Sequence, residues 1–299
     1  MSVSQTSRSR GPNSPDVTGF YESDTGSIQY VVSDPATKKA LIVDAVLNFD
    51  LRNARTSTSS ADELLAHVRE RGLAVEWIID THPHADHFMA AAYLKDKLKG
   101  RQGIGEKVRD IATLWRGYYH LPNAFNIDAE FDRLFRDSET FKLGALEVRA
   151  MLSPGHTLAS ITLVVGDDAA LVHDTLMQPD SGTSRCDFPG GDAAILYRSI
   201  KAILDLPAGT RLFVGHDYGC GGKRAPQWES TVAEQRRANI HVKDGISEAD
   251  YVKVRTTRDK TLPLPDRMLH ALQANLRGGR LPEPESDGVS YFKIPANRF

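Results

Sequence analysis

The stretch Thr81–His87 reads Thr-His-Pro-His-Ala-Asp-His and places three histidines and one aspartate within six residues. Imidazole and carboxylate groups are the ligands that proteins offer to borderline divalent metals such as zinc and Fe(II). Packing these side chains together without a metal would leave polar groups or charges uncompensated. The apolar segment Val75–Ile79 just before the stretch is typical of a short strand. The sequence therefore predicts a metal-binding loop at the end of a strand.

Further candidate ligands lie in three later segments, each of which follows a predicted strand or hairpin. They are His156 in the Ser153–Thr157 loop, Asp174 and His216. Loops at strand ends are where metal and catalytic groups usually project. Together with the first loop, these segments supply a candidate set made up of His82, His84, Asp86, His87, His156, Asp174 and His216.

This set permits two kinds of metal chemistry. If all of the side chains bind, two metals lie close together and share Asp174, which is the arrangement of a hydrolase that attacks an ester, thioester or phosphate with a bridging hydroxide. If two histidines and one carboxylate bind a single iron, coordination positions stay open, as in the facial triad of Fe(II) oxygenases. The ligand types alone leave both alternatives open.

The composition is that of a globular protein, with 299 residues, 40% of them hydrophobic and 25% charged, and a formal net charge of −2. The sequence has no excess of basic residues that would indicate nucleic acid or an anionic membrane as a partner. No apolar run approaches the ~20 residues that span a bilayer. Two cysteines are too few for a disulfide framework and suit a reducing compartment, so we expect a cytoplasmic location. Residues 1–16 are expected to form a disordered tail.

Hydrophobic patterning predicts alternating strands and helices. Strands are expected over Ile28–Val32, Ala40–Val46, Val75–Ile79, Ile161–Val165, Ala169–Val172, Arg211–Val214 and Val289–Ile294, with a hairpin over Phe141–Leu152. Helices are expected after Ser60, through Tyr93 and Leu98, and over Asp192–Leu206, Trp228–Ile240 and Pro265–Leu276. The polar stretch Gly100–Asp137 is expected to be an irregular insertion or lid. Because many strands are hairpin-linked, the sequence favours an α/β (α+β) fold with sheets inside and helices outside.

The two histidine loops, the aspartate after a strand and the His216 loop together resemble the metallo-β-lactamase superfamily. The resemblance extends from about Gly19 to Pro295. It implies an αββα sandwich with the metal site at one edge of the two sheets. We therefore expect residues 17–299 to form a single domain of this fold after the tail.

Within that superfamily, later segments resemble the persulfide dioxygenases, above all the bacterial branch called β-lactamase-like hydrolase. These segments are Asp174–Leu176, Gly182–Gly191, Leu196–Ile200, Gly215–Tyr218, Asn239–Val242 and Ile294–Asn297. The family reaction converts glutathione persulfide, O₂ and water to sulfite and glutathione. A soft sulfur anion suits Fe(II), and binding it beside O₂ on one metal would orient both reactants.

This resemblance implies one non-haem Fe(II) per chain, held by His82, His156 and Asp174 as the catalytic and metal-binding residues. The remaining candidate ligands would surround the iron or form a second metal site, and they are His84, Asp86, His87 and His216. The rival hypothesis is a dinuclear thioesterase of the glyoxalase II type, with one or two zinc ions on the same ligands. A third hypothesis is a non-catalytic module that binds a metal or senses sulfane sulfur. The segment Gly182–Gly191 favours the dioxygenase.

The resemblance also implies contacts with the substrate. Arg185 would face the glutathione or persulfide anion, because its planar fork suits carboxylates, and the rival interpretation pairs it with Asp187. Tyr218 would lie near the thiol, while Lys293 and Asn297 would meet a glutathione carboxylate. The predicted partners are thus a small thiol or persulfide and O₂, and a homodimer or larger homo-oligomer is compatible with the sequence.

His173 departs from the family pattern, in which glycine usually precedes the aspartate. A bulky imidazole at this position could tilt the carboxylate of Asp174, donate a hydrogen bond to it or add a ligand. Ser181 stands where the nearest branch tends to carry an aromatic residue. These departures bear on the identity of the substrate more than on metal binding.

Overall fold

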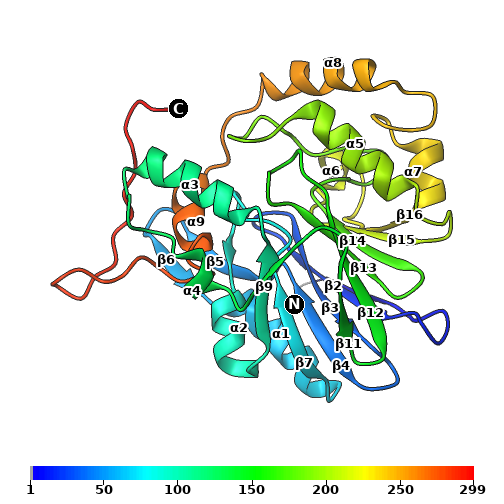
Figure 1. Cartoon of the computed structure of the whole chain (residues 1–299), viewed down its shortest axis with the longest axis horizontal. Helices are drawn as coiled ribbons and strands as arrows, with labels where there is room; N and C mark the ends of the chain where they lie inside the picture. The colour runs from blue at the N-terminus through cyan, green and yellow to red at the C-terminus, as the bar shows by residue number, and fades with distance from the viewer. Residues whose placement is uncertain (1–2) are drawn as a thin grey trace.

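Two β-sheets pack face to face at the centre of the molecule, and helices cover their outer faces (Figure 1). The computed structural model describes residues 3–299. Buried side chains form one core between the two sheets and another between the first sheet and its helices. The αββα arrangement expected from the sequence is therefore confirmed.

The strands belong to two large sheets and one small sheet. The first sheet runs in the spatial order β1 (Ser4–Ser7), β2 (Asp16–Glu22), β3 (Ser27–Ser33), β4 (Lys39–Val43), β7 (Ala74–Ile79), β9 (Arg101–Gly105) and β10 (Arg133–Phe135). The second runs β11 (Glu139–Leu143), β12 (Leu146–Leu152), β13 (Ile161–Val165), β14 (Ala169–His173), β15 (Arg211–Val214) and β16 (Glu229–Thr231). The small sheet has the order β6 (Arg55–Ser57), β5 (Val46–Asp50) and β8 (Phe88–Met89).

The helices lie outside these sheets (Figure 1). They are α1 (Ser59–Glu70), α2 (Ala91–Leu98), α3 (Val108–Tyr119), α4 (Ile127–Glu130), α5 (Ala193–Leu204), α6 (Gly219–Gly222), α7 (Val232–Ala238), α8 (Glu248–Asp259) and α9 (Met268–Asn275). Helix α5 begins where Asp192 accepts a hydrogen bond from the backbone N–H of Ile195 at 2.8 Å, which satisfies one of the free N–H groups of its first turn.

Alternation along the strands decides which core each side chain joins. In β4, Leu41 and Val43 belong to the core between the sheets, whereas Ile42 packs with α1 and α2. In β3, Tyr30 likewise belongs to the core between the sheets, and Val31 packs on the side of the helices. Because successive side chains of a strand point to opposite faces, apolar residues at consecutive positions show that both faces of this sheet are covered.

The stretch Gly100–Asp137 is not the irregular insertion or lid that we expected. It contributes β9, α3, α4 and β10, and its side chains Ile104, Ile111 and Trp115 are buried in one cluster with Leu272 of α9. Helix α3 is amphipathic, so charged residues on its exposed face lower the mean hydropathy of the stretch and conceal the apolar stripe.

Two predictions in the C-terminal part of the chain are also wrong, and one helix there was missed. The expected helix Trp228–Ile240 is divided, because Glu229–Thr231 pairs with β15 as a strand and only Val232–Ala238 is helical. Val289–Ile294 forms no strand. Helix α8 was not predicted, since its polar sequence has only a narrow buried stripe.

The N-terminal segment is ordered, which contradicts the disordered tail predicted for residues 1–16, of which residues 1–2 lie outside the described part. Strand β1 pairs antiparallel with β2. The side chain of Arg211 is fully buried and holds this segment, donating to Ser7 Oγ at 2.9 Å, Ser14 Oγ at 3.0 Å and Asp168 Oδ1 at 3.0 Å. A tail of polar residues is thus held by a distant partner that local composition does not reveal.

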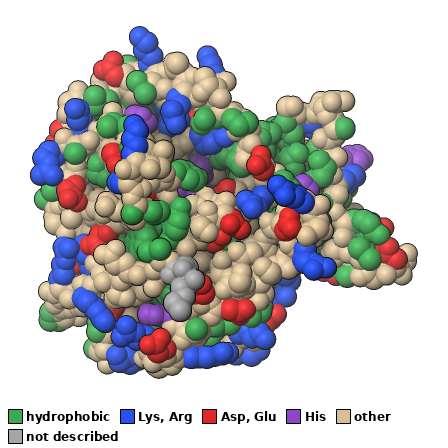
Figure 2. Space-filling model, turned by 180° about the vertical axis from the view of Figure 1, so that it is seen from behind, with side chains coloured by type: hydrophobic (Ala, Val, Ile, Leu, Met, Phe, Trp, Pro, Cys, Tyr) green, Lys and Arg blue, Asp and Glu red, His purple; other side chains and the backbone are tan. Residues whose placement is uncertain are grey.

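Charged side chains of both signs occur on the surface. In the view of Figure 2, acidic and basic side chains are interspersed over the face of the molecule. Within residues 3–299, we find no helix that combines the length and the apolar character needed to cross a membrane.

We expect Arg211→Met to lower the free energy of unfolding by about 3 kcal/mol, because it leaves several buried acceptors and the Asp168 carboxylate without their partner. Urea denaturation measures this change. Arg8→Ala is the matched control, since Arg8 pairs with Asp16 at 2.9 Å on the exposed surface and should cost less than about 1 kcal/mol. Equal losses in the two variants would contradict the anchoring role of Arg211.

Candidate metal centre

Four segments meet at one edge of the two sheets. The Thr81–His87 loop follows β7, Asp174 follows β14, His216 follows β15, and His156 lies between β12 and β13. Strands β14 and β15 are parallel, so their carboxyl ends lie at the same edge. An isolated β-bridge between Ser27 and His216 joins the first sheet to this edge. The topology therefore brings together candidate ligands that are far apart in the sequence.

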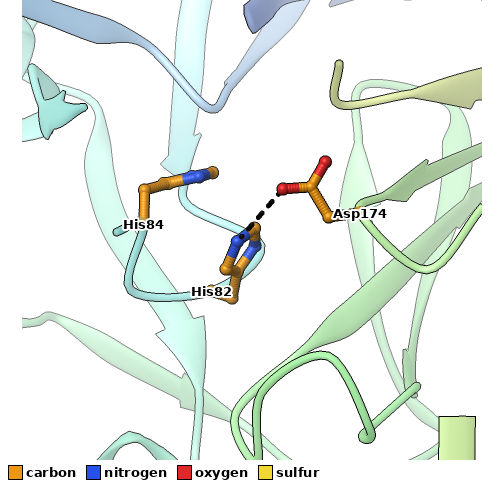
Figure 3. A group of neighbouring side chains, drawn as sticks. All are labelled: His82, His84 and Asp174. Atoms are coloured by element: carbon orange, nitrogen blue, oxygen red, sulfur yellow. Dashed lines mark ion pairs between the residues drawn. The ribbon is translucent and has the colours of Figure 1, made fainter. Parts of the chain in front are cut away.

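His82 and His156 approach the same oxygen of Asp174. Nε2 of His82 lies 3.6 Å from Oδ2 of Asp174, and Nε2 of His156 lies 3.7 Å from that oxygen. All three side chains are buried. Figure 3 shows His82 and His84 on one loop, with Asp174 reaching toward them from the other side. Two imidazole nitrogens thus face one carboxylate oxygen and the volume around it.

The neighbouring rings of His82 and His84 each have one buried nitrogen without a hydrogen-bond partner. These atoms are Nε2 of His82 and Nδ1 of His84. A buried polar atom left unpaired costs about 1–3 kcal/mol, so the cluster is costly as it stands. Ligand atoms of His82, His84 and Asp174 lie within 4.8 Å of one another. Imidazole and carboxylate at this spacing are a donor set for a divalent metal, and the residues present fit a metal cofactor.

Hydrogen bonds fix which ring nitrogen each histidine turns toward this volume. His82 Nδ1 lies 3.0 Å from Thr81 Oγ1, His84 Nε2 lies 3.1 Å from Asp44 Oδ1, and His156 Nδ1 donates to the Arg185 carbonyl at 2.7 Å. The opposite nitrogen of each ring is left for a metal. Such partners orient metal-binding histidines and set their tautomer.

His216 is held between two carboxylates. Its Nδ1 lies 2.6 Å from Asp174 Oδ1, and its Nε2 lies 2.8 Å from Asp86 Oδ2 and 2.9 Å from Ser27 Oγ. Burial disfavours a charge on this ring, but the negative charges of Asp174 and Asp86 outweigh it and raise the pKa of His216 well above its usual value. The imidazole is therefore positively charged near neutral pH and links the two carboxylates.

The Asp44 carboxylate outweighs burial at His84 and raises the pKa of that ring, but burial keeps the imidazoles of His82 and His87 neutral. It lowers the pKa of His82 well below its usual value, with the neighbouring His84 and His156 rings adding to the effect. It also lowers the pKa of His87 to about 4. Neutral imidazole is the form that binds a metal. The fold thus presents ready ligands on the His82 side of Asp174 and a protonated ring on the His216 side.

His173 adopts a backbone φ of 40°, in the region that favours glycine. This conformation accounts for the glycine that the family usually carries before the aspartate. The ring Nε2 lies 2.7 Å from Thr175 Oγ1 and 3.0 Å from Ser153 Oγ. Nε2 is thus tied to two hydroxyl groups, whereas Nδ1 of the same ring is buried without a hydrogen-bond partner.

We expect His173→Asn to make the metal-free protein less sensitive to acid, since asparagine tolerates positive φ. Burial lowers the pKa of His173 to about 3, whereas an unfolded imidazole binds a proton below about pH 6.5. This residue alone should therefore reduce the free energy of unfolding as the pH falls from 6.5 toward 3, by up to about 1.4 kcal/mol per pH unit. Urea unfolding of both metal-free proteins at about pH 6.5 and pH 5 measures the effect. A pH-independent difference between them would contradict it.

A cavity of about 890 Å³ opens beside the metal centre, a volume suited to a small-molecule substrate. Its lining includes Asp86, His156, Asp174 and His216 from the site described above. Other lining residues come from the α6 turn, from the segment after α7, from α8 and from the segment after α8, and include Lys223, His241, Arg255, Arg258 and Leu264. The cavity therefore connects the candidate ligands with a wall that carries cationic side chains.

Arg185 lines the cavity but its guanidinium already has partners. Nε and Nη2 bind the two oxygens of Asp187 at 2.7 and 2.8 Å, and Nη1 donates to the Pro263 carbonyl at 2.6 Å. The Arg185–Asp187 pair that the sequence left as the rival interpretation is therefore formed. The contribution of Arg185 to the site in this structure is its backbone carbonyl, which holds His156.

The other predicted substrate residues divide into two groups. Tyr218 lines the cavity, is 57% exposed and stacks on His216 with ring centroids 5.9 Å apart. Lys293 and Asn297 are not among the lining residues. Lys293 Nζ instead donates to the His120 carbonyl at 3.0 Å. The structure thus brings Tyr218, but not the C-terminal pair, to the candidate site.

Sequence reasoning did not identify four residues that shape the site, namely Ser27, Asp44, Lys223 and Arg258. Asp44 follows β4 as Asp174 follows β14, so an aspartate after a buried strand was a signal that could have found it. The other three carry no distinctive local pattern. They reach the site through the pairing of β3 with the His216 loop and through the placement of α6 and α8.

Residues 27–216 match the family described as the metallo-beta-lactamase superfamily, and the chain belongs to that superfamily of metal-dependent enzymes. A beta-lactamase hydrolase-like protein of Xylella fastidiosa is 54% identical over 95% of this chain, which spans 65% of that protein's length. Glyoxylase B2 of Dictyostelium discoideum is 42% identical over 93% of this chain and 96% of its own. The mitochondrial persulfide dioxygenase of Bos taurus is 30% identical over 87% of each chain.

A solved structure of the ETHE1 protein from Myxococcus xanthus superposes on this chain with a TM-score of 0.70 at 25% sequence identity. The match covers 88% of this chain and 99% of that one. The comparison supports the layered architecture described above. It also supports a distant relationship between this chain and the ETHE1 protein.

Proposed function

We propose that this chain is an Fe(II)-dependent persulfide dioxygenase that oxidises the terminal sulfur of glutathione persulfide with O₂. The observation that carries the proposal is the convergence of His82 and His156 on one oxygen of Asp174, while His216 is occupied between Asp174 and Asp86. Two histidines and one carboxylate form the set that non-haem Fe(II) oxygenases use. The relationship to a persulfide dioxygenase supports the same reaction.

His82, His156 and Asp174 would hold the iron, which when bound supplies adjacent positions for a persulfide sulfur and for O₂. The chain itself orients these ligands through Thr81 and the Arg185 carbonyl. Their burial also excludes bulk water from the His82 side of the site. Orientation of two reactants at one place is a large part of the rate that such a site can provide.

His216 would serve the substrate as a fixed positive charge and as a proton holder. Its ring lines the cavity, carries a proton between Asp174 and Asp86, and is stacked by Tyr218. An anionic persulfide would be attracted to this side of the cavity. In the overall reaction the S–S bond breaks, the terminal sulfur leaves as sulfite with two oxygen atoms from O₂ and one from water, and the inner sulfur leaves as the thiol.

Lys223 and Arg258 would bind the carboxylates of the thiol. Both line the cavity, and within residues 3–299 neither side chain forms a hydrogen bond or an ion pair. Free cations at the wall of a substrate cavity favour anionic ligands. This feature supports a substrate that, like glutathione persulfide, carries negative charge away from the reacting sulfur.

The reaction is tested by O₂ uptake of the anaerobically Fe(II)-loaded protein with glutathione persulfide. We expect O₂ consumption and sulfite formation in equal amounts, and loss of both in His156→Ala. Metal analysis of protein purified without added metal should find about one iron per chain. Absence of O₂ uptake, together with cleavage of a glutathione thioester, would reject the dioxygenase proposal.

We further expect Lys223→Met and Arg258→Met each to raise the KM for glutathione persulfide about tenfold while kcat changes less than about twofold, because these contacts would be equal in the ground and transition states. Steady-state O₂ uptake measures both constants. Lys142→Met serves as the control, since that exposed side chain lies on β11 outside the cavity. If KM stayed unchanged in both cavity variants, these residues would have no part in substrate binding.

Hydrolysis of a glutathione thioester on two metals is the second candidate function. The relationship to glyoxylase B2 favours it, and so does the group formed by His84, Asp86 and His87, whose ligand atoms lie within 4.8 Å of one another. This function would require His216 to lose its proton and to give up a carboxylate partner. Two zinc ions per chain and rapid thioester cleavage would establish it.

A further inference from the structure

Helix α8 presents a polar stripe to the protein interior. Its buried residues Tyr251, Arg255 and Asp259 follow one another at four-residue spacing, so they lie along one face of the helix. Arg255 is 2% exposed and Asp259 is 3% exposed, and the two form a buried ion pair. Buried charges are usually no better for stability than apolar side chains of similar volume. A polar stripe in this position therefore suggests a role besides stability.

Every residue of this stripe contacts one short segment, Thr183–Cys186. The hydroxyl of Tyr251 lies 3.0 Å from Thr183 Oγ1, and Arg255 Nη1 donates to the Thr183 carbonyl at 2.8 Å. Asp259 Oδ2 accepts from the backbone N–H of Cys186 at 3.0 Å and from its thiol at 3.4 Å. The helix thus holds both ends of the segment through directional bonds.

Arg185 lies between these two held ends, and its carbonyl accepts the hydrogen bond from His156 Nδ1 at 2.7 Å. This bond keeps the proton on Nδ1 and leaves Nε2 of His156 facing Oδ2 of Asp174 at 3.7 Å. A shift of the Arg185 carbonyl would therefore turn the imidazole or free it to change tautomer. The position of the ligand nitrogen depends on a segment that α8 holds in place.

We propose that the Arg255–Asp259 pair of α8 is a positioning device for the metal ligand His156, acting through the backbone of Thr183–Cys186. The pair touches no candidate ligand itself. This proposal is independent of the reaction that the site carries out, because it concerns how the chain holds the metal ligand His156 and not what the metal does. Loss of a group that contacts a metal ligand, but not the metal itself, commonly weakens metal binding by about ten- to a hundredfold.

Arg255 also lines the cavity, so a direct contact with substrate is the competing explanation. The two roles differ in what they affect. A substrate contact would change KM and leave metal binding unchanged. A positioning role changes the affinity and the coordination of the metal in the absence of any substrate.

The test is Co(II) binding to the metal-free full chain, followed by the visible ligand-field bands of the metal. The double variant Arg255→Met/Asp259→Leu fills the same space without buried charge, so it should fold. We expect its Kd for Co(II) to rise at least about tenfold and its ligand-field bands to shift. In the zinc-loaded protein, the His156 Nδ1–H signal should exchange faster with water by ¹⁵N NMR.

Arg198→Gln/Glu248→Gln is the matched control, because it breaks an exposed ion pair between α5 and the first residue of α8, with Arg198 Nη2 and Glu248 Oε1 2.8 Å apart. Its Co(II) affinity and spectrum should match those of the unchanged protein. A folded double variant with unchanged affinity, bands and exchange would overturn the proposal. If the double variant does not fold, Tyr251→Phe, which removes only the hydroxyl on Thr183, must shift the same readouts in the same direction, and unchanged readouts there would overturn the proposal equally.

Discussion

The unpaired imidazole nitrogens around Asp174 are the constraint on which the rest of the site depends. Nε2 of His82 and Nδ1 of His84 are buried without a hydrogen-bond partner, and they remain so only because the surrounding fold fixes each ring from its other side. Thr81 holds the His82 ring and Asp44 holds the His84 ring, and the Arg185 carbonyl holds His156 in the same way. Local stability is thereby given up for ligands that are already oriented when a metal arrives.

The metal loop, the strands and the helices outside them could be predicted from short-range patterns in the sequence, whereas the αββα layering was expected from the resemblance of the motifs to a known family. Three histidines and an aspartate within Thr81–His87 have no inexpensive alternative to a metal, and strands such as Ile161–Val165 and Ala169–Val172 are short segments rich in apolar residues. The same patterns placed His156, Asp174 and His216 at strand ends. Parallel pairing of β14 with β15 then brings two of these residues to one edge, as a ligand set requires.

The rest of the site depends on partners distant in the sequence, which local patterns do not reveal. Arg185 was expected to face the substrate, but Asp187 and the Pro263 carbonyl occupy its guanidinium, and its backbone is what reaches the centre. Helix α8 was missed because its buried stripe is polar. The N-terminal strand was missed because Arg211, far along the chain, holds it. In each case a tertiary contact outweighs composition.

The ligands come from both halves of the sandwich, and this division has a consequence for how the protein assembles. His82 and His84 belong to the first sheet, whereas His156 and Asp174 belong to the second, and the Ser27–His216 bridge joins the two beside them. A chain whose halves have formed but not docked has only part of a chelating site. Tight metal binding would therefore accompany the final docking of the halves, and a bound ion would act as a non-covalent crosslink that resists their separation.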